Sequence, residues 1–149
     1  MIRVVAVGKI KERYLAEALA EYAKRIARYD RLELVELSES RAGAAEARAQ
    51  EGRKILARLR PGESVVALDA GGREMSTEEF ARDLAKRRER NTLTYIIGGP
   101  EGLDAALLAR CDLSLSLSML TLPHRLARLV LYEQIYRALT ISAGHPYHR

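Results

Sequence analysis

Short apolar runs alternate with longer segments of helical periodicity along the whole chain. The runs predicted as strands are Ile2–Val7, Arg31–Leu37, Ser64–Asp69, Leu93–Ile97 and a last one beginning at Leu113. The segments predicted as helices are Lys11–Tyr29, Ala42–Arg60, Ser76–Arg90, Asp104–Arg110 and a long one from Pro123 to Gly144. This alternation predicts an α/β fold, with a mostly parallel sheet and helices on both faces.

Several boundaries between these segments have their own local signals. Pro61-Gly62 stops the second helix, and Ala70–Arg73 is predicted as a tight turn after the third strand. Ser76 and Glu79 have the spacing of a capping box, which opens the third helix. The chain shows no repeat, low-complexity segment or linker, so we expect one domain over residues 1–149.

The stretch from the last strand into the last helix is the most informative part of the chain. Leu113, Leu115 and Leu117 alternate with serines, a period of two, and Pro123 then fits the first turn of a helix. The loop between them follows the carboxyl end of a strand, where parallel α/β proteins bind ligands. An ordinary strand–loop–helix connection is the alternative.

Three strand ends are predicted to meet at one edge of the sheet. They are Leu68-Asp69, Gly98–Gly102 and Leu117–Leu122, and in a parallel sheet they would line one pocket. The glycine loop lacks the pattern of a phosphate-binding loop. Its glycines suit the close approach of a flat ligand to the backbone, or a turn that needs positive φ.

Composition narrows the class of protein. The chain has 149 residues, 48% of them hydrophobic, and a single cysteine, Cys111, so an intrachain disulfide and a paired-cysteine metal motif are excluded. No apolar run is long enough to span a membrane, and the N-terminus has no signal-peptide layout, so we expect a cytoplasmic protein with no membrane partner.

The charge favours an anionic partner. The net charge is +5, and aromatic residues make up only 5% of the chain. The low aromatic content disfavours a base-stacking platform, so RNA would be held through phosphate contacts and shape. Arg125 and Arg128, on the first turns of the last helix, are candidate RNA-binding residues, and a solvated helix face is their alternative role.

Other candidate residues favour structural roles. Asp69 has the position of a phosphoacceptor in receiver domains, but Val5–Gly8 supplies no acidic pair for the magnesium ion that this chemistry needs. His124, at a helix start, is typical of a capping or packing residue more than of a base. Glu133 and Arg137 have the spacing of a surface ion pair. The remaining histidines, His145 and His148, lack metal-ligand spacing, and we expect no metal.

Four motifs together resemble one known family. They are Gly98–Leu103, Ser116–His124, Glu133–Ala138 and Pro146–His148. Val7–Lys9 and Glu21–Arg25 near the N-terminus fit the same pattern. The chain resembles, over nearly its whole length, the bacterial ribosomal RNA large-subunit methyltransferase H family of the SPOUT class.

The resemblance implies a fold, a reaction and partners. It implies a C-terminal trefoil knot over about residues 93–149, a homodimer, and S-adenosylmethionine as cofactor. The family methylates N3 of a pseudouridine in the helix-69 hairpin of 23S ribosomal RNA, on assembled ribosomes. By motif, the cofactor-binding residues would be Leu68, Gly98, Leu117, Ser118, Met119, Leu120, Thr121 and Leu122.

A catalytic role for the C-terminal tail is a hypothesis. Tyr147, His148 and Arg149 would position the target base, with Arg149 stabilising developing negative charge and His148 or water accepting the proton. Simple packing of the tail at a dimer interface is the alternative. Two other functions stay open: a non-enzymatic ribosome-binding factor, and a SPOUT methyltransferase that acts on another RNA base.

Overall fold

The structure, a computed structural model, describes residues 1–148 and contains a five-stranded parallel sheet. Its strands are β1 (Ile2–Val7), β2 (Leu32–Leu37), β3 (Ser64–Glu74), β4 (Leu93–Ile97) and β5 (Leu113–Ser116). They lie in the order β2-β1-β4-β3-β5, and each neighbouring pair is parallel. The predicted element order and the parallel sheet are confirmed.

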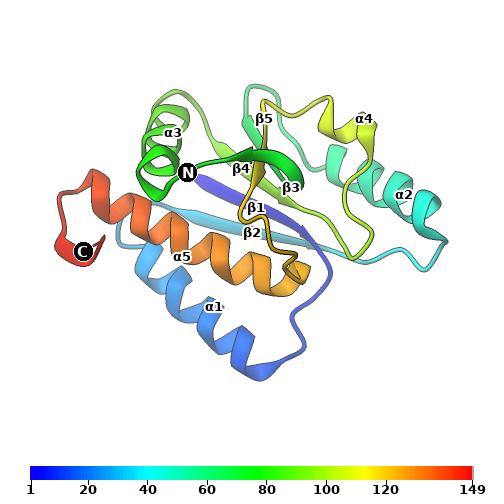
Figure 1. Ribbon diagram of the computed structural model, residues 1–149, viewed down its shortest axis with the longest axis horizontal. Coiled ribbons are helices and arrows are strands. Elements are labelled where there is room, and N and C mark those ends of the chain that lie inside the picture. The colour runs from blue at the N-terminus through cyan, green and yellow to red at the C-terminus, as the bar shows by residue number, and fades with distance from the viewer. Residues whose placement is uncertain (149) are drawn as a thin grey trace.

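Helices cover both faces of the sheet, as predicted (Figure 1). They are α1 (Arg13–Ile26), α2 (Ala44–Leu56), α3 (Thr77–Arg90), α4 (Ala105–Leu108) and α5 (His124–Ser142), followed by the short 3₁₀ helix η1 (Pro146–His148). Helices α1, α3 and α5 pack on one face, and α2 and α4 pack on the other. Figure 1 shows α1 and α5 side by side on the first face.

The first strand is buried along its whole length because it lies between β2 and β4 with helices on both sides. Ile2, Val4 and Ala6 contribute to one core, and Val5 and Val7 contribute to the other. This division follows the period of two of a strand. It also explains the unbroken apolar run in the sequence, which is typical of a parallel strand buried on both faces.

The prediction of a tight turn at residues 70–73 is wrong, because β3 continues to Glu74. The pairing register with β5 shifts between Leu68 and Arg73, so the strand bends without ending. Gly72 allows this close pairing. A Cβ atom there would lie 2.6 Å from the carbonyl carbon of Ser114 in β5.

The last helix separates two regions of interest. Pro123 is its N-cap residue, and Gly144, with a φ of 72°, follows its end. The 19 residues of α5 span about 28 Å at 1.5 Å per residue. Its N-terminus lies at the carboxyl edge of the sheet, and its C-terminus leads into η1 and the tail (Figure 1).

Candidate functional site

The three strand ends meet in one pocket of about 160 Å³ at the carboxyl edge of the sheet, as predicted. Segments that follow β4 and β5, the middle of β3 and the start of α5 all contribute to its wall. The lining residues are Leu68, Asp69, Ala70, Ile97, Gly98, Gly99, Gly102, Ser116, Leu117, Ser118, Leu120, Thr121, Leu122, His124 and Ala127. The wall is mainly leucine side chains and glycine backbone.

Every predicted cofactor-binding residue except Met119 lines this pocket. The Met119 side chain is 88% exposed, beside Leu120 at 77%. Two hydrogen bonds shape this loop. Ser116 Oγ donates to the Ser118 carbonyl at 3.0 Å, and the Leu120 N–H donates to Ser118 Oγ at 2.9 Å. The structure thus brings the predicted residues together, while their role as cofactor ligands stays a prediction.

The glycine loop after β4 is tightly closed on itself. The Gly102 N–H donates to the Gly99 carbonyl at 3.0 Å, and Gly102 has a φ of 80°. A Cβ atom at Gly98 would lie 2.9 Å from Leu103 Cδ2 and 3.0 Å from the Gly102 carbonyl carbon. Gly98 is therefore required by the loop itself, apart from any ligand.

A buried carboxylate, which no sequence pattern indicates, lies behind this loop. Glu51 is only 4% exposed, and its Oε2 accepts the Ser40 N–H at 2.8 Å. Its Oε1 is buried without a hydrogen-bond partner among the described residues. A Cβ atom at Gly99 would lie 3.1 Å from this oxygen. Glu51 therefore lies directly against Gly99, a residue of the pocket wall.

His124 is the one imidazole in the pocket wall. Its Nε2 atom is 3.4 Å from Glu39 Oε1, and it is buried without a hydrogen-bond partner among residues 1–148. The pKa of His124 is lowered, mainly by burial of the ring. The positive charges of Arg125 and Arg128 lower this pKa further, whereas the carboxylate of Glu39 raises it. The ring is thus neutral at neutral pH. The cap of α5 involves no side-chain hydrogen bond, so the capping role considered for His124 is not supported.

The two candidate RNA-binding arginines have different environments. Arg128 is only 1% exposed; it pairs with Glu36 at 2.6 Å and donates to the Gly8 carbonyl at 2.9 Å. An arginine so enclosed ties α5 to β1 and β2, and its burial argues against the prediction that it contacts RNA. Arg125 pairs with Glu12 at 3.2 Å and is partly exposed, so its contact with RNA stays a prediction.

The tail packs at the far end of α5 from the pocket. The Tyr147 ring contacts that of Tyr136 at 4.6 Å between centroids, and His148 Nε2 lies 3.0 Å from Glu78 Oε1 in α3. Arg149 lies outside the described residues. The predicted ion pair of Glu133 and Arg137 is confirmed at 2.6 Å, and the Tyr147 hydroxyl donates to Glu133. The structure does not bring the tail and the pocket of one chain together.

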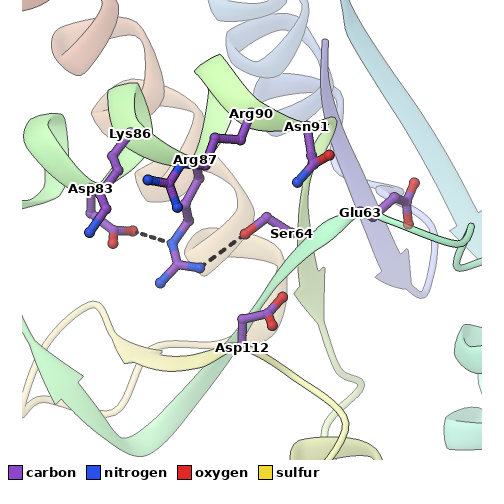
Figure 2. Close-up of a pocket in the computed structure, with 8 residues that line it drawn as sticks. All are labelled: Glu63, Ser64, Asp83, Lys86, Arg87, Arg90, Asn91 and Asp112. Carbon is purple, nitrogen blue, oxygen red and sulfur yellow. Dashed lines mark hydrogen bonds and ion pairs between the residues drawn. The ribbon is translucent and has the colours of Figure 1, made fainter.

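A larger cavity, of about 340 Å³, lies at the opposite, amino edge of the sheet (Figure 2). Its wall is charged, and several of these groups are engaged with each other or with the backbone. Arg87 donates to Asp83 at 2.8 Å and to Ser64 at 2.9 Å, and Asp112 accepts the Val65 N–H at 2.7 Å. Arg87 in this cavity links α3 to β3 of the sheet. The carboxyl-edge pocket is therefore the better candidate site.

Within residues 1–148, no group of three His, Cys, Asp or Glu side chains is arranged to hold a metal ion. None of the helices described has the length and apolar character needed to cross a bilayer.

Comparison with known proteins gives a consistent result. A family profile described as "Predicted SPOUT methyltransferase" matches residues 1–148. Two proteins named "Ribosomal RNA large subunit methyltransferase H" are similar over 99% of both chains. The one from Carboxydothermus hydrogenoformans is 46% identical over 157 residues, and the one from Anaeromyxobacter sp. (strain K) is 49% identical over 151.

The fold is also similar to that of a solved structure, a probable methylase family protein from Haemophilus influenzae Rd KW20. The TM-score is 0.58 at 13% identity, over 99% of this chain and 70% of that one. At this identity the likeness shows a common fold alone.

Proposed function

Because the chain belongs to the SPOUT methyltransferase family, we propose that it methylates large-subunit ribosomal RNA with S-adenosylmethionine as the methyl donor. The observation that carries this proposal is the single apolar pocket formed by three strand ends. Relatives that match over their full length bear the name of a large-subunit ribosomal RNA methyltransferase. The enzyme would act in the cytoplasm, where ribosomes are.

The pocket residues fit the adenosine part of this cofactor. Leu68, Leu117 and Leu122 offer apolar walls for a flat adenine, and the glycine loop offers backbone edges. Asp69 is the carboxylate in the wall, and it suits ribose hydroxyls or a positive charge. The volume of 160 Å³ is below the roughly 300 Å³ usual for such ligands. The exposed loop at Met119 and Leu120, or a second subunit, must therefore complete the site.

We propose that the acceptor is N3 of a pseudouridine in the helix-69 hairpin of 23S ribosomal RNA, on assembled ribosomes. When bound, S-adenosylmethionine supplies a methyl group on a positively charged sulfur. The chain then has to align the acceptor nitrogen with this group, exclude water and remove one proton. The net charge of +5 suits the approach to ribosomal RNA, and Arg125 is the candidate contact at the pocket mouth.

We propose a homodimer in which each tail serves the pocket of the other subunit. Exposed apolar side chains support a second copy as a cover, among them Met119 and Leu120 in the loop beside the pocket. The distance along α5 between the tail and the pocket also supports action between subunits. In that arrangement Tyr147, His148 and Arg149 would position the target base.

The single domain of residues 1–149 would have its C-terminal part, about residues 93–149, threaded as a trefoil knot. The family assignment supports this topology, which the hydrophobic pattern of the chain does not predict, because knots are almost absent from proteins. Tracing the chain in an experimental electron density map tests it.

Two experiments test the proposed function. Calorimetric titration with S-adenosylmethionine, with and without ribosomes, should give saturable binding. Incubation with ribosomes that lack the modification should then add one methyl group, which mass spectrometry of RNA fragments maps to helix 69. Binding of ribosomes without cofactor or transfer would favour a non-enzymatic ribosome-binding factor, and a methyl group elsewhere would favour another target base.

A further inference from the structure

We propose that His124, oriented by Glu39, accepts the proton that the target base loses on methylation. This inference rests on the proposed function, since it concerns the acceptor of that reaction. Within one chain, His148 lies 3.0 Å from Glu78, at the far end of α5 from the pocket. In the proposed dimer the tail of the partner positions the target base, and His124, in the pocket wall itself, takes the proton that the sequence assigns to His148 or water.

The position of His124 supports the role. It is the first residue of α5, and it lines the pocket together with the glycine loop and the run from Leu117 to Leu122. The rest of the wall consists of apolar side chains, glycines, small hydroxyl side chains and one carboxylate, Asp69. Within the described part of the pocket, His124 is therefore the one imidazole that a bound base would meet, and an imidazole can accept a proton near neutral pH.

Glu39 gives the ring an orientation. Its Oε1 lies 3.4 Å from Nε2, which is long for a hydrogen bond to the neutral ring and within the range of an ion pair once the ring is protonated. Gly8 leaves room for this pair, since a Cβ atom there would lie 3.2 Å from Nε2 and 2.7 Å from Glu39 Oε1. We assign the ring hydrogen to Nε2, on the side of Glu39, which leaves Nδ1 to accept the proton and makes Glu39 a positioning residue.

The reaction balances with these groups. The N3–H proton of the imide moves to Nδ1 of His124, and the N3 electron pair forms the bond to the methyl carbon. The bond between that carbon and sulfur breaks, and its electron pair stays on sulfur. The imidazolium that results is stabilised by the carboxylate of Glu39.

The charges around the ring keep it ready to accept a proton. Glu39 faces it from the loop after β2, Arg125 and Arg128 from α5, and Asp69 shares the pocket wall from β3. Burial is the largest influence and lowers the pKa of His124, so the ring is neutral in the resting protein. A neutral ring next to a carboxylate is the state that a general base needs.

The test compares His124→Gln and Glu39→Gln with His145→Gln, a histidine exposed near the C-terminus, as the matched control. Activity on ribosomes, cofactor binding by calorimetry and the titration of ring resonances by NMR are measured for each. We expect H124Q to lower kcat by about 10²- to 10⁴-fold at pH 7. Its dissociation constant for S-adenosylmethionine should stay within about threefold, since the leucines and glycines hold the adenosine. Its rate should rise with pH as the imide ionises by itself.

The Glu39→Gln variant separates orientation from mere packing. Loss of the carboxylate should lower the pKa of His124 further in the NMR titration and move the acid limb of the pH–rate profile to lower pH, with a reduced plateau. The control should match the wild type in all three measurements.

Three results would overturn the proposal. The first is H124Q with the wild-type rate and pH profile, and the second is H124Q that loses activity only because cofactor binding is lost. The third is a Glu39→Gln variant whose pH–rate profile is the same as that of the wild type. A wild-type protein that fails to methylate ribosomes would instead overturn the proposed function, and the role of His124 with it.

Discussion

Gly72 allows the second half of β3 to lie directly against β5. We expect Gly72→Ala to destabilise the protein by about 3 kcal/mol, because the added methyl group would meet backbone atoms that cannot move aside. Urea unfolding followed by circular dichroism measures the change. Gly43→Ala is the control, since a Cβ atom there meets nothing within 4 Å, and it should change stability by less than about 1 kcal/mol. Equal effects of the two substitutions would contradict the steric argument.

The thiol of Cys111 should react slowly with thiol reagents. Burial, together with nearby Asp112, raises the pKa of the thiol to about 11, and Sγ donates to the Leu107 carbonyl at 3.3 Å. Because only the thiolate reacts, we expect modification by a disulfide reagent at pH 8 to be about a hundredfold slower than for a free cysteine. The same chain in concentrated urea is the internal control and should react at the ordinary rate. Fast reaction of the folded protein would contradict the burial of this thiol.

At the residue scale, the residues that line the pocket could be predicted from the sequence, but the ion pairs of the charged residues near it could not. Leu68, Gly98 and Leu117 were predictable because each follows a strand whose carboxyl end has a known place in a parallel sheet. The burial of Arg128 was not, because its partner Glu36 is 92 residues earlier in the chain. Helical spacing indicates which residues lie on the same face of a helix. It does not show which carboxylate from a distant part of the chain packs against that face.

The third helix depends on a reciprocal cap at its start. The Glu79 N–H donates to Ser76 Oγ at 3.1 Å, and the Ser76 N–H donates to Glu79 Oε2 at 2.8 Å, as the sequence predicted. We expect Ser76→Ala to cost about 1 kcal/mol of stability, measured by thermal unfolding. Glu79→Gln is the control, because glutamine can also reach back to the backbone.

The same cap should respond to pH. The hydrogen bond from the Ser76 backbone lowers the pKa of Glu79 from its ordinary value of 4.5. This contribution to stability is present above pH 4.5 and is lost as the pH falls through the lowered pKa. Identical unfolding of the Ser76→Ala and wild-type proteins at pH 7 would contradict the role of the cap.

At the element scale, the strand and helix order was predictable, and the length of β3 was not. Each helix has an apolar face, and each strand is a short apolar run, so both periods are visible in the sequence. Residues 70–73 include two glycines, which in sequence indicate a turn. In the fold these residues belong to β3 and lie beside β5, which comes some 40 residues later in the chain. The strand β5 can approach the backbone closely at Gly72 because glycine has no side chain.

For the whole molecule, the separation of tail and pocket leads to a mixing experiment. Leu117→Glu, which places a charge in the apolar pocket, and deletion of Tyr147–Arg149 should each abolish methylation. Co-expression of the two variants should restore about a quarter of the wild-type rate per chain, because half of the dimers are mixed and each has one intact pocket served by one intact tail.

The controls for this experiment are simple. Light scattering should show that each variant is still a dimer, and calorimetry should show cofactor binding by the tail deletion alone. No recovery in the mixed sample would indicate that the tail acts within its own chain. Full activity of the deletion variant would remove the tail from the reaction.

The position of β4 has a consequence for how the protein is made. The fourth strand in the chain is the third in the sheet, between β1 and β3. Until it has left the ribosome, β1 and β3 have no partner on their shared side, and β3 still lacks β5 as well. A nascent chain ending before Leu93 therefore carries apolar strands with open edges, which are prone to pair with other chains. This enzyme should consequently fold late, after most of its length has been synthesised, and stalled fragments of it should be frequent clients of chaperones.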